Sequence, residues 1–203
     1  FSNFEKLSDN LVINKLDWLK KSISWKNKYP IVLNSYRSQK KYVNPYYFME
    51  RLSNFLKKDE VVITDDGAHL TWTIQALKVL KNQRLFSAFG NSPMGYAFPA
   101  SIGASIALNK KRIICIDGDG SIQINIQELQ TMISNQLPIK IIIINNDGYG
   151  IIKQFQELYL NKRYEAVDSK KGVTNPNFLK IAKAYGVKYS EIKNNSNIDK
   201  VLS

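Results

Sequence analysis

The chain has 203 residues and is poor in several residue types, and each scarcity excludes a class of protein. It has one cysteine, Cys115, so no disulfide can form within it, and a disulfide-stapled secreted scaffold is excluded. So few cysteines fit a reducing compartment, and we expect a cytoplasmic location. No apolar run is long enough to span a bilayer, and the first residues do not form a signal-peptide pattern, so we expect no membrane partner.

Acidic residues are also scarce: there are 17 of them against 29 lysines and arginines, which gives a formal net charge of +12. A basic protein can bind nucleic acid or attract anionic ligands. The lysines are scattered, however, and neither a long basic run nor a nucleic-acid-binding motif is present. The charge therefore favours a solvated lysine-rich surface, and we expect no nucleic-acid partner.

Residues 1–41 are polar and irregular, apart from a helical pattern around Leu11 to Trp25. We interpret this stretch as a linker or the tail of a preceding domain, with its aromatic side chains packed onto the body. The chain begins with Phe1 and stops at Ser203 within a polar stretch, so we expect both ends to be cuts in a longer polypeptide. Residues 42–203 are expected to form one domain.

Strand and helix patterns alternate regularly within residues 42–203. Asn44 followed by Pro45 predicts a helix start, because asparagine caps a helix and proline suits its first position. Further on we expect strands at Val61–Thr64, Leu85–Ala88, Arg112–Ile116 and Ile139–Ile144, helices at Leu70–Leu80, Tyr96–Leu108 and Asn125–Asn135, and a helix starting at Asn175–Pro176. The fold class is therefore α/β, a doubly wound and mainly parallel sheet with helices on both faces.

Three polar loops follow predicted strands, at residues 65–69, 117–121 and 145–150. Residues 139–144 are almost all isoleucine without polar alternation, which is typical of a strand covered on both faces. The carboxyl ends of parallel strands meet at one edge of a sheet, where such folds bind their ligands. We therefore expect the three loops to form one binding site.

The sequence Gly118-Asp119-Gly120-Ser121 follows one predicted strand, and Asn145-Asn146 follows the next. A carboxylate, an amide oxygen and a backbone carbonyl are the hard ligands that suit Mg²⁺, with phosphate and water completing its shell. Asp and Gly end strands in many α/β proteins, so the tetrapeptide alone decides little. Its pairing with two asparagines on the next strand favours a magnesium site.

With this pair the chain resembles the thiamin-diphosphate-dependent enzymes over about Asn44 to Ile192. The resemblance implies that Asp119 and Asn146 bind Mg²⁺ through their side chains and Gly148 through its carbonyl. It implies cofactor contacts at Asp66, Gly67, His69, Ser92, Met94, Gly118, Asp119, Gly120, Ser121, Asn146, Gly148, Tyr149, Gly150, Ile151 and Ile152.

Within these enzymes the chain is most similar to acetolactate synthases. Residues 89–96, ending in Met94-Gly95-Tyr96, resemble their glycine-rich loop, so Met94 would support the bent cofactor and the Ser92 carbonyl would meet its amino group. The run from His69 to Trp72 resembles their His-x-x-Trp, although Ala68 stands where they carry a polar residue.

Residues 150–156 resemble the synthase stretch Gly-Met-Val-x-Gln-Trp-Gln. Ile151 and Ile152 would line the cofactor pocket, and Phe155 would shape the substrate pocket in place of tryptophan. This exchange leaves the acceptor open.

The resemblance implies decarboxylation of a 2-keto acid such as pyruvate and transfer of the two-carbon unit to a second carbonyl. The activating glutamate would come from an N-terminal domain of a partner subunit in a homodimer or homotetramer. We therefore expect no catalytic residue and no activity in this chain alone, and FAD in the parent enzyme stays open.

Four alternatives remain. The loop Asn146-Asp147-Gly148-Tyr149 resembles that of simple 2-keto acid decarboxylases, but these typically carry a glutamate where this chain has Ile152. The other three are a carboligase acting on a keto sugar, a non-catalytic homologue and a basic nucleic-acid binder.

Overall fold

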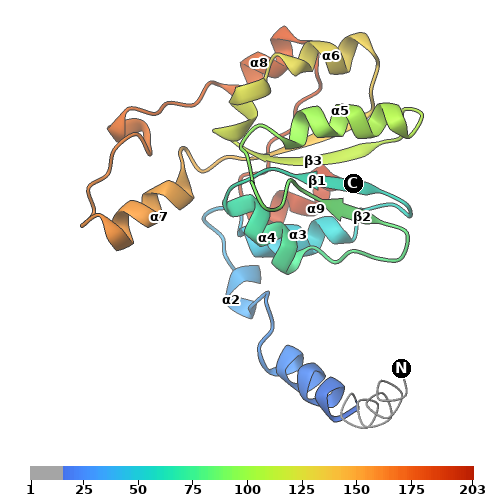
Figure 1. Cartoon of the computed structure of the whole chain (residues 1–203), viewed down its shortest axis with the longest axis vertical. Helices are drawn as coiled ribbons and strands as arrows, with labels where there is room; N and C mark the ends of the chain where they lie inside the picture. The colour runs from blue at the N-terminus through green and yellow to red at the C-terminus, as the bar shows by residue number, and fades with distance from the viewer. Residues whose placement is uncertain (1–15) are drawn as a thin grey trace, which may run out of the picture.

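The computed structural model describes residues 16–203 (Figure 1). Residues 16–28 are helical, and the named helices are α2 Asn34–Arg37, α3 Pro45–Ser53, α4 Ala68–Ala76, α5 Ala97–Ala107, α6 Glu128–Ser134, α7 Gly150–Tyr159, α8 Phe178–Ala184 and α9 Ile198–Leu202. The strands are β1 Val61–Thr64, β2 Arg84–Phe86, β3 Ile113–Gly118 and β4 Ile139–Ile144. Three 3₁₀ turns are η1 Ser121–Asn125, η2 Ser169–Lys171 and η3 Asn195–Asn197.

The four strands form one parallel sheet in the order β2-β1-β3-β4. From β1 the chain moves to β2 on one side, and β3 then returns to the other side of β1. The strand order therefore reverses between β1 and β3, and the loops that follow these strands flank a crevice of the kind that binds ligands. The predicted α/β class and parallel sheet are confirmed.

Each face of the sheet carries its own apolar core. Ile63 and Cys115 point into a core completed by α5, α6 and α8, whereas Val62 and Ile114 point into a core completed by α3, α4 and α9. Figure 1 shows these two groups of helices on opposite sides of the sheet. Side chains alternate along a strand, so a strand between two layers of helices must be apolar at nearly every position.

Strand β4 lies at an edge of the sheet, where it pairs only with β3 among the described residues. Ile141 and Ile143 contact one core, and Ile142 and Ile144 contact the other, so both faces are covered as predicted. These four residues are only half-buried, however, because no strand covers their outer side.

Three predicted helices differ from those observed. The helix predicted at Leu70–Leu80 begins and ends earlier, as α4 at Ala68–Ala76. Residues 125–135 do not form one helix but the end of η1 and then α6. The helix predicted to start at Asn175 begins at Phe178, where the Asn177 side chain accepts from the N–H of Lys180 at 3.0 Å. The predicted cap at Asn44 is confirmed, since its side chain accepts from Tyr47 N–H at 3.1 Å.

The helix at residues 16–28 lies away from the sheet (Figure 1). Trp18 and Trp25 are 60% and 44% exposed and pack edge to face on each other, with ring centroids 5.6 Å apart. The expectation that the aromatic side chains of residues 1–41 pack onto the body is therefore wrong for these two tryptophans, whereas Tyr36 does contact the body, where it stacks on Tyr46 of α3 with ring centroids 5.7 Å apart. Leu11, at the start of the predicted pattern, lies outside the described residues.

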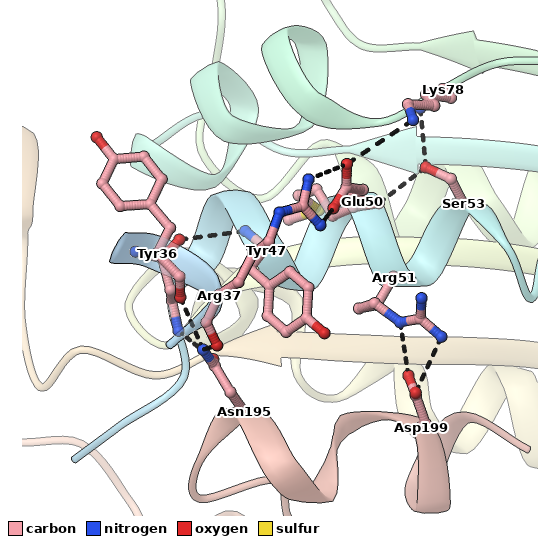
Figure 2. A network of polar contacts seen from close by, with 11 residues as sticks. Tyr36, Arg37, Tyr47, Glu50, Arg51, Ser53, Lys78, Asn195 and Asp199 are labelled. Atoms are coloured by element: carbon pink, nitrogen blue, oxygen red, sulfur yellow. Dashed lines mark hydrogen bonds and ion pairs between the residues drawn. The ribbon is translucent and has the colours of Figure 1, made fainter. Parts of the chain in front are cut away.

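A polar network joins α2, α3 and the end of the chain (Figure 2). Arg37 forms a bidentate ion pair with Glu50 of α3, and Arg51 forms another with Asp199 of α9 at 2.8 and 2.9 Å. Asn195 donates to the carbonyls of Tyr36 and Arg37 at 2.8 and 3.2 Å. These contacts fix the segment before α3 against the C-terminal residues.

Within residues 16–203, no helix combines the length and the apolar character that crossing a membrane requires.

Candidate functional site

A pocket opens at the carboxyl ends of β1, β3 and β4, as expected from the three polar loops. It is lined by Asp66, Gly67, Ala68, His69, Trp72, Met94, Gly118, Asp119, Gly120, Ser121, Ile144, Asn146, Gly148, Tyr149, Gly150, Ile151 and Ile152. The structure thus brings together every residue for which the resemblance implied a cofactor contact, except Ser92. Ala68, Trp72 and Ile144 also line the pocket and were absent from that set.

Two predicted site residues lie outside the pocket lining. Ser92 sits in the preceding turn with a φ of 42°, and its N–H donates to the Ala88 carbonyl at 2.9 Å. Phe155 is 52% exposed on α7, and its ring packs against Tyr159 with centroids 4.9 Å apart. The structure therefore gives neither residue a contact with the pocket.

Asp119 ties the loop after β3 to the loop after β4. Its Oδ2 accepts from the N–H groups of Gly148 at 3.1 Å and Asn146 at 3.2 Å, and its Oδ1 accepts from Gly120 N–H at 2.9 Å. Burial raises the pKa of Asp119, and these backbone N–H groups oppose the rise because they stabilise the carboxylate.

Three oxygen ligands for a cation can converge beside Asp119. One atom of the Asn146 side-chain amide lies 3.1 Å from the Gly148 carbonyl oxygen and 3.2 Å from Asp119 Oδ1. If this atom is the amide nitrogen, it donates to both neighbours; if it is the oxygen, three oxygens face one another and need a cation between them. Carboxylate, amide and carbonyl oxygens are the donors that Mg²⁺ takes, so the residues fit this ion.

No cluster of three His, Cys, Asp or Glu side chains is present anywhere in residues 16–203. A site for a softer metal, built from such ligands, is therefore not part of the described structure. The candidate metal site depends on one carboxylate and two neutral oxygens, and a bound diphosphate would supply the further charge.

His69 is buried at the start of α4, and its Nε2 has no hydrogen-bond partner in the described structure. Burial lowers its pKa to about 4, while the nearby Asp65 carboxylate acts in the opposite direction. The imidazole is therefore neutral at pH 7 and can offer a hydrogen bond, but no positive charge, to a ligand in the pocket. A β-carbon would lie 2.6 Å from the His69 ring at Gly67 and 3.0 Å from it at Gly118, so both glycines make room for the ring.

Asp65 is a buried site residue that the sequence patterns did not single out. Its carboxylate accepts from the N–H groups of Gly95 at 2.8 Å, Tyr96 at 3.3 Å and Asp66 at 2.7 Å. It thereby holds the glycine-rich loop that carries Met94 against the end of β1. The signal in the sequence that could have identified Asp65 is its position as a carboxylate directly after an apolar run that forms a fully buried strand.

Asp117 is a second carboxyl that the sequence patterns missed, and it is fully buried at the end of β3. Burial, together with the charge of Asp65, raises its pKa to about 8. Its Oδ1 accepts from Gly118 N–H at 2.8 Å and from the Ser121 hydroxyl, whereas its Oδ2 has no partner in the described structure. Asp117 is thus expected to carry a proton at neutral pH.

Asn175 was expected to begin a helix, but its side chain instead reaches Asp119. Its Nδ2 donates to Asp119 Oδ2 at 2.6 Å, and its Oδ1 accepts from Gln123 Nε2 at 3.0 Å. The two residues are separated by 56 positions in the chain, so no local pattern could reveal this contact.

The sequence of residues 65–203 matches the family model described as thiamine pyrophosphate enzyme, C-terminal TPP binding domain. The chain belongs to this family. Thiamine pyrophosphate is another name for thiamin diphosphate, so the predicted resemblance is confirmed. The match begins at Asp65, directly after β1, and it therefore includes all three loops that line the pocket.

Individual relatives of this thiamine pyrophosphate enzyme domain are acetolactate synthases. The chain is 34% identical over 201 residues to the acetolactate synthase large subunit of Porphyra purpurea, covering 99% of this chain and 32% of that protein. It is 35% identical over 207 residues to the large subunit of Cyanidium caldarium, covering 100% of this chain and 34% of that protein. It is 34% identical over 192 residues to the mitochondrial acetolactate synthase of Schizosaccharomyces pombe, covering 93% and 28%. The chain thus spans about a third of the length of the curated relatives it matches.

Proposed function

We propose that the pocket binds thiamin diphosphate together with Mg²⁺. Asp119 and Asn146 would hold the metal through their side-chain oxygens, and Gly148 through its carbonyl. The observation that carries this proposal is the convergence of these three groups within 3.1 and 3.2 Å beside a pocket with an unpartnered imidazole. The family match over residues 65–203 supports the choice of cofactor.

We propose further that the complete protein decarboxylates a 2-keto acid, most simply pyruvate, and joins the two-carbon unit to a second carbonyl as an acetolactate synthase does. When bound, thiamin diphosphate supplies the nucleophilic carbon and the electron sink that this chemistry needs. The similarity to acetolactate synthases supports the reaction class.

The residues of this chain would bind, orient and shield the cofactor. Met94, held by the Asp65 contacts at Gly95 and Tyr96, would support its bent shape. Ile151 and Ile152, which also line the pocket, would help to exclude water from it. A drier site makes an ionised substrate carboxylate less stable than the neutral product of CO₂ loss, and so it favours decarboxylation.

The rest of the machinery would come from outside this chain. We propose a homodimer or homotetramer in which a glutamate of a partner subunit faces the cofactor's pyrimidine ring. Among the described residues that line the pocket there is no glutamate, and the carboxylates are Asp66 and the proposed metal ligand Asp119. We therefore expect no turnover from this chain alone. The visible absorption spectrum of the complete protein tests whether it binds FAD.

The test is turnover by the full-length protein with pyruvate, thiamin diphosphate and Mg²⁺, with acetolactate and acetaldehyde quantified separately. Acetolactate is the expected product. Acetaldehyde alone would contradict carboligation and support a simple decarboxylase. Bound cofactor without either product would contradict pyruvate as the substrate, and a keto sugar acceptor would be tested next.

A binding measurement separates the cofactor proposal from the reaction. Asp119→Ala should abolish Mg²⁺-dependent retention of thiamin diphosphate, because it removes the one carboxylate among the three proposed protein ligands of the metal. Retention equal to that of the unchanged protein would show that the metal site is assigned wrongly.

A further inference from the structure

Residues 167–175 lie across the loops that carry the proposed metal ligands, and we name this segment the strap. The Val167 carbonyl accepts from Tyr149 N–H at 2.9 Å, and Asp168 forms an isolated antiparallel bridge with Gly148. Asp168 also forms an ion pair of 2.7 Å with Lys153 on α7. One end of the strap therefore fixes the backbone at Gly148, whose carbonyl is a proposed ligand.

The other end of the strap fixes the side chain of Asp119. Asn175 Nδ2 donates to Asp119 Oδ2 at 2.6 Å, the shortest N–H donation that this carboxylate receives. Gln123 Nε2 donates both to Asn175 Oδ1 at 3.0 Å and to the Asp119 carbonyl at 2.9 Å. Because Gln123 presents a donor to the Asn175 oxygen, the nitrogen of Asn175 must face Asp119.

These contacts make the two oxygens of Asp119 unequal. Oδ2 accepts from three N–H groups, those of Asn146, Gly148 and Asn175, so its lone pairs are fully used. Oδ1 accepts only from Gly120 N–H, and it is the oxygen that lies 3.2 Å from the Asn146 amide. A lone pair therefore remains only on the oxygen that faces the proposed metal position.

We propose that Asn175, oriented by Gln123, is a positioning residue that holds Asp119 so that it binds the divalent cation through Oδ1 alone. The inference rests on the proposed magnesium site and adds residues that are not ligands. Without Asn175, Oδ2 loses its shortest partner, and the carboxylate can rotate about its last bond and take water or the cation at either oxygen. Partners of this kind are worth roughly 10- to 100-fold in metal affinity.

The test is Mn²⁺ binding to the full-length protein in the presence of thiamin diphosphate, with free Mn²⁺ counted by electron paramagnetic resonance. Asn175→Ala should raise the Mn²⁺ dissociation constant by roughly 10- to 100-fold. Gln123→Ala should raise it less, because Asn175 remains. The double variant should lose less than the product of the two single losses, since both residues act on one carboxylate.

Asn177→Ala is the matched control, because it removes another asparagine of the same loop, one that caps α8 and does not reach Asp119. It should leave Mn²⁺ affinity unchanged although it lowers stability. An equal loss in Asn175→Ala and Asn177→Ala would overturn the inference and show a merely structural role. Unchanged binding in Asn175→Ala would also overturn it.

Asp119→Ala distinguishes failure of this inference from failure of the metal site. If Asp119→Ala abolishes Mn²⁺ binding and Asn175→Ala does not weaken it, only the positioning role is wrong. If Asp119→Ala binds Mn²⁺ normally, the proposed metal site is wrong and the inference falls with it.

Discussion

Val167 lies so close to Gly148 that Gly148 has no room for a side chain. A β-carbon at Gly148 would overlap the Val167 carbonyl oxygen, which is fixed by its bond from Tyr149 N–H. Gly148 also has a φ of +156°, a conformation that residues with a side chain rarely adopt. The loop after β4 can therefore approach the strap only because this residue is glycine.

Gly148→Ala should destabilise the protein by about 3 kcal/mol, because backbone strain adds to a clash with an atom that cannot move aside. It should also weaken Mn²⁺ binding, since the Gly148 carbonyl would shift. Urea unfolding and metal titration measure the two effects. Gly172→Ala is the control: Gly172 has a φ of +92° but open space around it, so only about 1 kcal/mol of strain is expected. Equal losses in both variants would contradict the role given to the Val167 contact.

Glu60→Ala should cost about 3 kcal/mol of unfolding free energy. Glu60 is 2% exposed and forms a bidentate ion pair with Arg112, and it also accepts from Lys57 N–H at 2.7 Å. Its removal breaks an ion pair whose carboxylate is buried and leaves the Arg112 guanidinium without its counter-charge. Asp199→Ala breaks the Arg51 pair of Figure 2, in which the carboxylate is 54% exposed, and should cost about 0.5 kcal/mol. Similar costs for the two variants in urea unfolding would show that burial of the Glu60 pair adds nothing.

Asp117→Asn should make the metal-free protein more stable at pH 8. The pKa of Asp117 rises from its ordinary 3.8 to about 8 in the folded state, so this state binds a proton that the unfolded state has lost. Stability from this group is therefore present at low pH and declines between about pH 4 and pH 8, by about 1.4 kcal/mol per pH unit. Urea unfolding between pH 6.5 and pH 8, where the His69 contribution no longer changes, should show the decline in the unchanged protein and not in Asp117→Asn. Parallel pH profiles would contradict a protonated Asp117.

His69→Gln should stabilise the metal-free protein at acidic pH. Burial lowers the His69 pKa from 6.5 to about 4 in the folded state. Between these two pH values the imidazole is therefore protonated in the unfolded state and neutral in the folded state. Stability from this group is present above pH 6.5 and is lost as the pH falls to 4. Between these values the His69 and Asp117 contributions have opposite slopes and offset each other. If His69→Gln and the unchanged protein unfolded at the same acidic pH, the result would contradict a neutral buried imidazole.

Cys115 should not react with a thiol reagent in the folded protein. It lies on β3, and its side chain is fully buried in the core completed by α5, α6 and α8, where burial raises the pKa of the thiol well above its ordinary value. No thiolate is then available to attack at pH 8. Ellman's reagent should label it only after denaturation, and the assay is unambiguous because the chain has a single cysteine. Rapid labelling of the folded protein would contradict the burial.

Local signals predicted the parts of the site that each lie on one continuous stretch of chain. Val61–Thr64 and Ile139–Ile144 were predicted at their observed bounds, because unbroken β-branched runs have few alternatives to a buried strand. The Gly118–Ser121 and Asn145–Asn146 loops then met at one sheet edge because parallel strands align their carboxyl ends. Helix bounds were predicted less well: α4 and α6 are shorter than expected, since a helix can end wherever tertiary contacts supply other partners for its backbone.

Asn175 shows where local patterns fail. Asparagine followed by proline is a common helix start, and Asn175-Pro176 was therefore expected to begin a helix. The residue that caps α8 is instead Asn177, and the Asn175 amide donates to Asp119. The exposed aromatics of residues 16–28 show the same limit, because an apolar stripe predicts a helix but not the surface that covers it.

The sequence by itself determined the α/β class, the family and the identity of the proposed metal ligands, because periodicity and short motifs are properties of neighbouring residues. Only the tertiary structure decided which oxygen of Asp119 is free, why Gly148 must be glycine, and that Asp65, Asp117 and Asn175 belong to the site. These facts depend on the contact of strands and loops from distant parts of the chain. Burial and hydrogen-bond geometry, which set the pKa values of His69 and Asp117, exist only once those parts have packed together.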